Sequence, residues 1–270
     1  MTNITMVTGP TGSGKSTLIE IVHHALVDDQ KKMRVMDTSA CVAESRRRRT
    51  KVGKQLLKLG DAQKAGFLLP GDLVVESVME NLEWFGEGQD GIVPFHVFLA
   101  GSPRTVEEAQ RWKEVFASDK KLLLRVLHVE CTREEVHDGI KARKKNGVNR
   151  EDDAAESLKT KWDEYQGQTL PALNLLGGDI LYKTKRERPL LERVHNLVGI
   201  AAVPEHTRRN WFAKLHNSNH PIHEAIERVE NGLELEGRPR VTSSLSRSYP
   251  PGSHLSIPPH WKPLVFRASP

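Results

Sequence analysis

The feature that most constrains this chain is a glycine-rich turn between a short apolar strand and an apolar helix start, residues 7–20, VTGPTGSGKSTLIE. Residues 9–16 fit the pattern G-x-x-x-x-G-K-[ST]. Glycines allow backbone N–H groups to point inward at phosphate oxygens, and the N-terminus of the following helix favours an anion. The turn therefore predicts a site for nucleotide phosphates. The motif alone leaves open a kinase, a GTPase and an ATP-driven machine.

Each residue type in the turn has a chemical reason to be there. The Lys15 ammonium reaches the β- and γ-phosphates of a bound nucleotide, and the Ser16 hydroxyl can ligate Mg²⁺. The residues predicted to bind the donor phosphates are Gly9, Gly12, Ser13, Gly14, Lys15, Ser16 and Thr17.

Short apolar runs rich in β-branched residues alternate with helical patterns up to about residue 199. The runs predict strands at 4–9, 33–37, 95–101, 122–130 and 179–184. The helical patterns cover 15–28, 52–64, 71–85, 104–117, 133–145 and 152–176. Strands separated by helices of this length pair in parallel, so the chain predicts an α/β fold, a three-layer sandwich around a five-stranded parallel sheet. This pattern does not give the order of the strands.

Composition adds weaker constraints. The 270 residues are enough for one α/β domain of about 200 residues and a smaller part. A net charge of +5 over this length suits an enzyme that handles phosphates as well as a nucleic-acid binder. Cys41 and Cys131 have neither metal-binding spacing nor a disulfide framework, which favours a reducing cytoplasm. With no apolar run of 18 residues, no membrane association is expected.

Three further motifs follow the phosphate loop: GFLLPGDLV (66–74), FLAGSPRTVEEAQ (98–110) and NREDDAAESLKTKWDEYQGQTLPAL (149–173). In this order they resemble the adenylate kinases, within the nucleoside monophosphate kinases, over about residues 1–199. The resemblance implies a P-loop NTPase fold with a small helical monophosphate-binding part at about 37–74. It also implies a lid at about 143–152. The six residues between Arg143 and Arg150 resemble the short-lid form of the family.

The resemblance implies ATP-dependent phosphoryl transfer to a nucleoside monophosphate, most simply AMP, with Mg²⁺. Such transfer needs alignment of donor and acceptor and positive charge around the moving group. The implied catalytic residues are Lys15, Arg104, Arg143, Arg150 and Lys161, the last standing where the family usually has arginine. The candidates for acceptor binding are Thr38, Arg46, Phe67, Leu69, Gly101, Arg104, Glu108, Arg150 and Lys161. Arg188 is a candidate for the donor nucleotide, and Asp152 and Asp153 for the lid.

The acceptor side departs from the family pattern. Ala40 and Ala100 stand where acids are usual, and Ala43 where an arginine is usual. The run 46–49, four arginines, either replaces that charge from the next helical turn or forms a solvated basic face.

Two further departures concern base recognition. Glu108 stands where a glutamine usually reads adenine, and a carboxylate only accepts hydrogen bonds, so it suits a donor-rich edge such as that of guanine. Gly139 stands where an arginine usually stacks on the donor adenine. Three alternatives stay open: an adenylate kinase with compensating residues, a kinase for another acceptor, and a relative that binds nucleotide without turnover.

Residues 200–270 exceed the usual length of the family and are expected to form an extension. One helix is predicted at about 220–231, followed by an extended or disordered tail rich in proline, serine and arginine. The extension either packs on the kinase domain or tethers a nucleic acid or protein. A monomer is expected.

Overall fold

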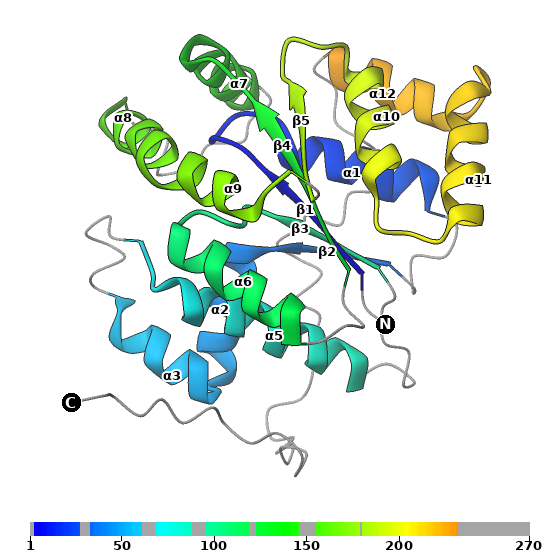
Figure 1. The fold of residues 1–270 in the computed structure, drawn as a ribbon. Coiled ribbons are helices and arrows are strands. Elements are labelled where there is room, and N and C mark those ends of the chain that lie inside the picture. Colours follow the sequence, from blue (N-terminus) through cyan, green and yellow to red (C-terminus); the bar gives the residue numbers. More distant parts are fainter. Residues whose placement is uncertain are drawn as a thin grey trace.

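A parallel five-stranded sheet forms the centre of the computed structural model, with strand order β2-β3-β1-β4-β5. The structure describes residues 3–27, 33–60, 68–87, 96–118, 123–145, 155–178 and 180–231. The strands are β1 (Asn3–Thr8), β2 (Met33–Asp37), β3 (His96–Ala100), β4 (Leu123–Glu130) and β5 (Leu181–Lys185). Helices cover both faces of the sheet (Figure 1), so the chain has the predicted three-layer, P-loop NTPase-like α/β fold.

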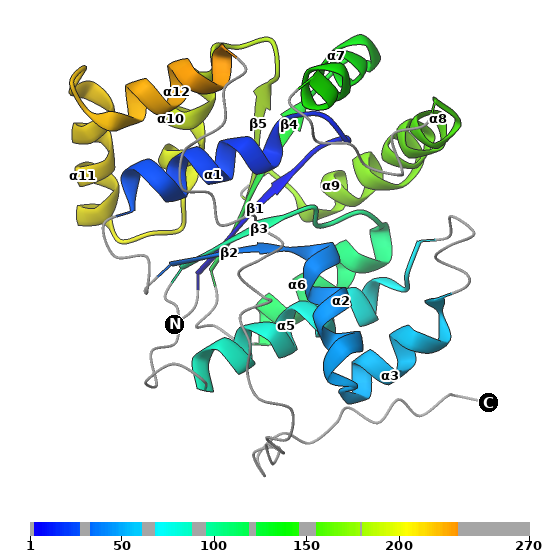
Figure 2. The same ribbon diagram turned by 180° about the vertical axis from the view of Figure 1, so that it is seen from behind.

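The helices divide between the two faces of the sheet. Helices α1, α10, α11 and α12 cover one face, and α2, α5, α6 and α9 cover the other, as the two opposite views show (Figures 1 and 2). Their bounds are α1 (Lys15–Leu26), α2 (Thr38–Arg48), α3 (Lys51–Lys58), α5 (Gly71–Glu87), α6 (Val106–Ser118), α7 (Arg133–Lys145), α8 (Ala155–Glu164), the π-helical turn η3 (Tyr165–Thr169), α9 (Leu170–Leu176), α10 (Leu190–Ile200), α11 (Glu205–His216) and α12 (Pro221–Glu230).

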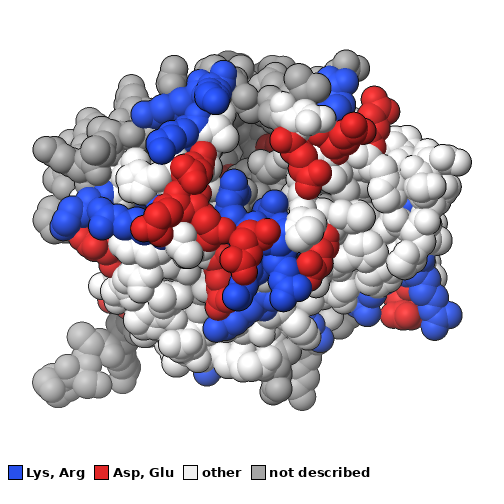
Figure 3. Space-filling view, turned by 90° about the horizontal axis from the view of Figure 1, so that it is seen from above, with Lys and Arg blue, Asp and Glu red and all other residues white. Residues whose placement is uncertain are grey.

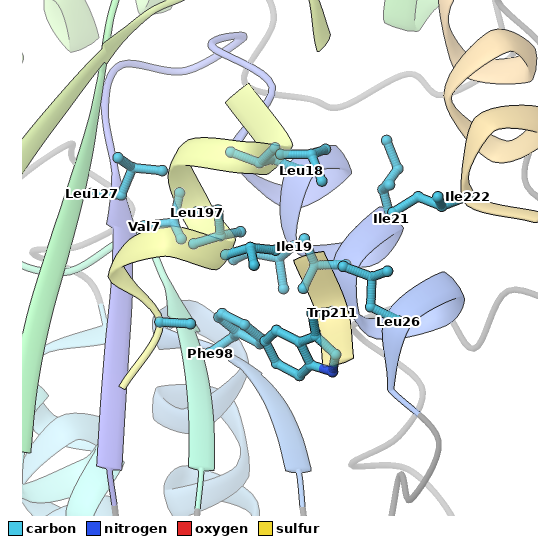
Figure 4. Packing of buried hydrophobic residues seen from close by; sticks show 14 of the residues in the cluster. Val7, Leu18, Ile19, Ile21, Leu26, Phe98, Leu127, Leu197, Trp211 and Ile222 are labelled. Carbon is cyan, nitrogen blue, oxygen red and sulfur yellow. The ribbon is translucent and has the colours of Figure 1, made fainter. Parts of the chain in front are cut away.

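The two cores follow from the alternation of side chains along each strand. Val7 of β1 points toward α1 and packs with Phe98 and Leu127 of the neighbouring strands (Figure 4). Met6, its neighbour, points to the opposite face and packs with Leu99. Burial on both faces explains why the strands read as continuous apolar runs.

Residues after 200 pack on the same core. The Ala202 amide donates to Thr5 Oγ1 at 3.1 Å, and the Ala202 carbonyl lies 3.0 Å from His96 Nδ1. Trp211 of α11 and Ile222 of α12 are buried against α1 (Figure 4). Part of the segment expected as an extension therefore belongs to the same apolar core as α1.

The sequence pattern predicted all five strands but not all the helices. Helices α2, α10 and α11 were not predicted, and α3 ends at Lys58, earlier than the predicted 64. The consecutive arginines of α2 and the many polar residues of α11 obscure an apolar period, since α11 buries mainly Trp211 and Leu215. Within the described ranges, no helix has the length and apolar character needed to cross a membrane.

Candidate functional site

The turn after β1 is a backbone cradle at the start of α1. Gly14 is the N-cap of α1 and adopts a left-handed conformation with φ 86° and ψ 15°, which glycine adopts without strain. The Lys15 ammonium donates to the Pro10 carbonyl at 2.8 Å and to Ser13 Oγ at 3.4 Å. Ser16 lies in the first turn of α1, so its hydroxyl is at the same end of the helix.

Helix α7 lies directly over this loop. A Cβ atom on Gly12 would lie 2.7 Å from the Val136 carbonyl oxygen, and a Cβ on Gly139 would lie 2.1 Å from the Gly12 carbonyl oxygen. Both distances are to backbone atoms, so neither position can carry a side chain without moving α7 away from the loop. Gly139, a departure from the family pattern, is thus required by the packing.

The turn after β5 also faces the loop, but not through the predicted Arg188. The Arg188 guanidinium is exposed and pairs with Glu192, one turn along α10. Arg186 and Arg193 are the arginines whose guanidinium groups lie beside Gly14. Sequence reasoning missed both, although basic residues just after the fifth strand were an available signal.

The ends of β2 and β3 bring together a second group of predicted residues. Thr38 Oγ1 donates to the Ala100 carbonyl at 2.9 Å. Arg104 Nε donates to the Gly101 carbonyl at 3.0 Å, and its Nη2 lies 3.4 Å from Ser39 Oγ. These bonds join the starts of α2 and α6 across the carboxyl edge of the sheet.

Glu108 lies under this turn with a side chain only 2% exposed. Its carboxylate accepts hydrogen bonds from Ser102 Oγ and from the Arg104 amide, the latter at 2.8 Å. Trp112 Nε1 donates to the same Ser102 hydroxyl at 2.8 Å. Burial raises the pKa of the Glu108 carboxyl. Both carboxylate oxygens thus accept hydrogen bonds from the turn that presents Arg104.

The arginine run of α2 bonds to its own helical unit. Arg46 donates through Nε and Nη2 to the Leu56 carbonyl, at 3.2 and 3.0 Å. Arg47 pairs with Glu44, and Arg48 donates to Asn81 Oδ1 at 2.9 Å. These bonds tie α2 to α3 and α5 around a small apolar cluster, Val42, Val52, Leu56 and Leu73, against which Leu69 packs.

The helical run 155–176 connects the two groups of residues. Tyr165 Oη lies 2.7 Å from His128 Nε2 at the end of β4, and Thr169 Oγ1 donates to the Arg104 carbonyl at 3.1 Å. Burial lowers the pKa of His128 to about 4. Burial raises the pKa of the Glu164 carboxyl, and the nearby charges of Arg104 and Lys161 oppose that shift.

The structure describes only some of the remaining candidates for the lid and the acceptor site. Arg143 is half-buried in the last turn of α7, and Lys161 is half-buried in the last turn of α8. Phe67, Arg150, Asp152 and Asp153 lie outside the described residues. Viewed onto this end of the molecule, Lys and Arg side chains gather in the middle of the face with Asp and Glu beside them (Figure 3).

The protein donors for a metal ion are few. No group of three or more His, Cys, Asp or Glu among the described residues is arranged to hold one. The Asp37 carboxylate is bonded to the Ser39 and Ala40 amides, at 2.9 and 3.2 Å. The Ser16 hydroxyl at the phosphate loop suits Mg²⁺, which commonly binds through few protein ligands, substrate phosphates and water.

The chain is similar in sequence to known adenylate kinases. An adenylate kinase of Corynebacterium diphtheriae is 28% identical over 173 residues, covering 64% of this chain and 85% of that relative. An adenylate kinase of Trichodesmium erythraeum is 26% identical over 165 residues, covering 61% and 79%. No family model matches the chain. The chain is therefore similar to adenylate kinases over 61 to 64% of its length, and its P-loop NTPase-like fold is consistent with that similarity.

Proposed function

We propose that the protein is an ATP-dependent nucleoside monophosphate kinase, most simply an adenylate kinase that converts ATP and AMP to two ADP. The observation that carries the proposal is the adjacency of two turns. Strand β3 pairs with β1, and the Gly101 amide donates to the Val7 carbonyl at 3.2 Å. The turn that presents Arg104 therefore lies beside the phosphate loop, as direct transfer between two nucleotides requires.

In this proposal the loop amides and Lys15 hold the donor phosphates, while Thr38, Gly101 and Arg104 hold the acceptor phosphate. An acceptor phosphate oxygen bonds to the γ-phosphorus as the bond to the β,γ-bridging oxygen breaks, and the electron pair stays on ADP. The Ser16 hydroxyl would ligate the Mg²⁺ that accompanies ATP, and the ion would supply positive charge beside the phosphates. Arg143, Arg150 and Lys161 close over the transferring group, with Asp152 and Asp153 shaping a short lid.

Exclusion of water decides whether the γ-phosphoryl group is transferred or hydrolysed. The run 155–176 suits this task because it is fastened on the donor side through Tyr165 and on the acceptor side through Thr169. We further propose a cytoplasmic monomer, a location that the two unpaired cysteines support.

A second candidate function is nucleotide binding without turnover. Ala40 and Ala100 favour it, because they follow or end β2 and β3 at positions where the family that the chain resembles usually has acids. It predicts tight MgATP binding with no nucleoside diphosphate formed. Use of another acceptor remains a third candidate, favoured by Ala43.

The test is to incubate the full chain with MgATP and each of AMP, GMP, CMP and UMP, beside a control without acceptor, and to separate the product nucleotides. ADP formed at twice the rate of AMP consumption supports adenylate kinase. Product with another monophosphate alone moves the proposal to that substrate. ATP binding without any diphosphate product overturns the kinase and favours the second candidate.

A further inference from the structure

Two arginines from the far edge of the sheet converge on the phosphate loop. Arg186 follows β5, and Arg193 lies in the first turn of α10. An ideal Cβ on Gly14 would lie 2.5 Å from Arg186 Nη1 and 3.5 Å from Arg193 Nη1. An ideal Cβ on Gly139 of α7 would lie 3.4 Å from Arg186 Nη2. The Arg186 guanidinium thus lies between the loop and α7.

The backbone and the core hold both side chains there. The Arg186 amide donates to the Glu130 carbonyl at 2.8 Å, which continues the pairing of β5 with β4 by one residue. Arg193 is 9% exposed, and its Nε donates to the Arg188 carbonyl at 3.1 Å. With Nε held in this way, Arg193 Nη1 lies beside Gly14 at the start of α1.

Neither guanidinium forms an ion pair with an acid within the part of the chain that the structure describes. Burial lowers the pKa of Arg193 and the like charge of Arg186 lowers it further, while the charges of Glu230 and Glu135 oppose the shift without cancelling it. A buried charge without a counter-charge is costly, and a second cation beside it adds repulsion. A bound anion would remove both costs.

We propose that Arg186 and Arg193 bind the phosphates of the donor nucleotide, so that two guanidinium groups from the β5–α10 side complete the loop. The assignment rests on the proposed function only in taking the loop as the donor site. Arginine suits this role because its fork of N–H donors matches phosphate oxygens. Arg186 also brings charge to the space beside Gly139, where close contact with the Gly12 backbone excludes a side chain at position 139 itself.

The test is to titrate MgATP and ADP into the full chain by calorimetry, for wild type, Arg186→Ala and Arg186→Gln. Loss of a charge-assisted bond to phosphate predicts a Kd raised about tenfold or more for both nucleotides in both variants. A shallower dependence of Kd on salt concentration should accompany it. Arg186→Lys should restore part of the affinity. Thermal melting checks that each variant is folded, and Gln replaces Ala if Ala does not fold.

Lys185→Ala is the matched control. Lys185 is adjacent in sequence and exposed, and its ammonium pairs with Glu187 at 3.4 Å, so nucleotide affinity should not change. A Kd for the Arg186 variants equal to or below that of wild type would overturn the assignment, because Arg186 would then merely fill the empty loop. If wild type transfers phosphate while these variants bind normally, only this inference fails. If wild type binds neither MgATP nor ADP, the proposed function fails with it.

Discussion

The proposed donor and acceptor sides of the site differ in how their basic residues are bonded. On the donor side, Arg186 and Arg193 point at the N-terminus of α1 without an acidic partner among the described residues. On the acceptor side, Arg46 and Arg48 bond to the Leu56 carbonyl and to Asn81. A guanidinium whose Nη group is bonded within its own helical unit, as in Arg46 and Arg48, stabilises that unit, while one that forms no ion pair and has Nη1 beside the loop is available to a ligand.

The difference teaches that counting arginines in a sequence does not locate an anion site. The run 46–49 is the most conspicuous basic feature of the chain. In the structure, however, Arg46, Arg47 and Arg48 are bonded to Leu56, Glu44 and Asn81. Arg104 is a single arginine in a turn, and its guanidinium contacts Gly101 after β3 and Ser39 after β2. The following predictions test this contrast.

The largest effect is expected from Lys15→Ala. Removing the ammonium that lies within the loop takes away charge stabilisation of the transferring phosphoryl group. Turnover of MgATP with AMP should fall about 10²- to 10³-fold, while circular dichroism shows an unchanged fold. A variant that keeps more than half of wild-type turnover would remove the loop from the catalytic account.

Arg104→Ala should weaken the acceptor side selectively. The kcat/KM for the monophosphate should fall about 10- to 100-fold, because a charge-assisted contact to phosphate is lost, while the Kd for MgATP stays unchanged. Arg111→Ala is a suitable control, since Arg111 on α6 pairs with Glu114 at 3.2 Å, away from the turn. Equal losses of donor and acceptor affinity in Arg104→Ala would contradict the division into two sides.

Acid should lower the free energy of unfolding through His128, which contacts Tyr165 of the run 155–176. This buried imidazole has a pKa of about 4, against about 6.5 in an unfolded chain. Above pH 6.5 both states are neutral and the contribution to stability is complete. As pH falls the unfolded chain takes up the proton first, so stability decreases between pH 6.5 and 4, by about 2 kcal/mol at pH 5.

Urea unfolding of wild type and His128→Gln at pH 7 and pH 5 measures this contribution. The variant should lose about 2 kcal/mol less than wild type between the two pH values. His96, fully buried with a pKa of about 4, should remain as a second source of acid sensitivity in both proteins. Identical pH dependence in the two proteins would mean that folding does not lower the pKa of His128, which would contradict this prediction.

Arg46→Ala should have the smallest effect, and on stability alone. Losing its bonds to the Leu56 carbonyl should lower the free energy of unfolding by about 1 kcal/mol, with the KM for the acceptor changed less than about twofold. Chemical denaturation and steady-state kinetics on the same preparation separate the two effects. A large rise in KM at unchanged stability would assign Arg46 to the acceptor instead.

The sequence predicted the strands well because apolar runs on both faces of a parallel sheet leave a strong signal. It missed α2 and α11, whose packing depends on a few buried residues in polar surroundings, such as Cys41 and Trp211. These contacts exist only once the sheet and α1 have formed, so no local sequence pattern predicts them.

The same limit applies to the site. The loop at residues 9–16 could be recognised because its residues are contiguous and the phosphate binding predicted for it uses backbone groups. The roles of Glu108 and Arg186 depend on partners distant in space or on burial, including Trp112 and the Gly12–Gly139 contact. The resemblance placed Glu108 at a base edge, and the structure adds hydrogen bonds from Ser102 and the Arg104 amide that no sequence pattern indicated.

The most direct test of the central claim is to follow the γ-phosphate of ATP itself. ATP labelled at the γ-position is incubated with the full chain and Mg²⁺, with and without AMP, and the label is located among ADP, ATP and inorganic phosphate. The account predicts label in ADP only when AMP is present, with little free phosphate and with transfer largely lost in Lys15→Ala. Label released as free phosphate regardless of AMP, or no loss of ATP at all, would contradict a site built to join two nucleotides.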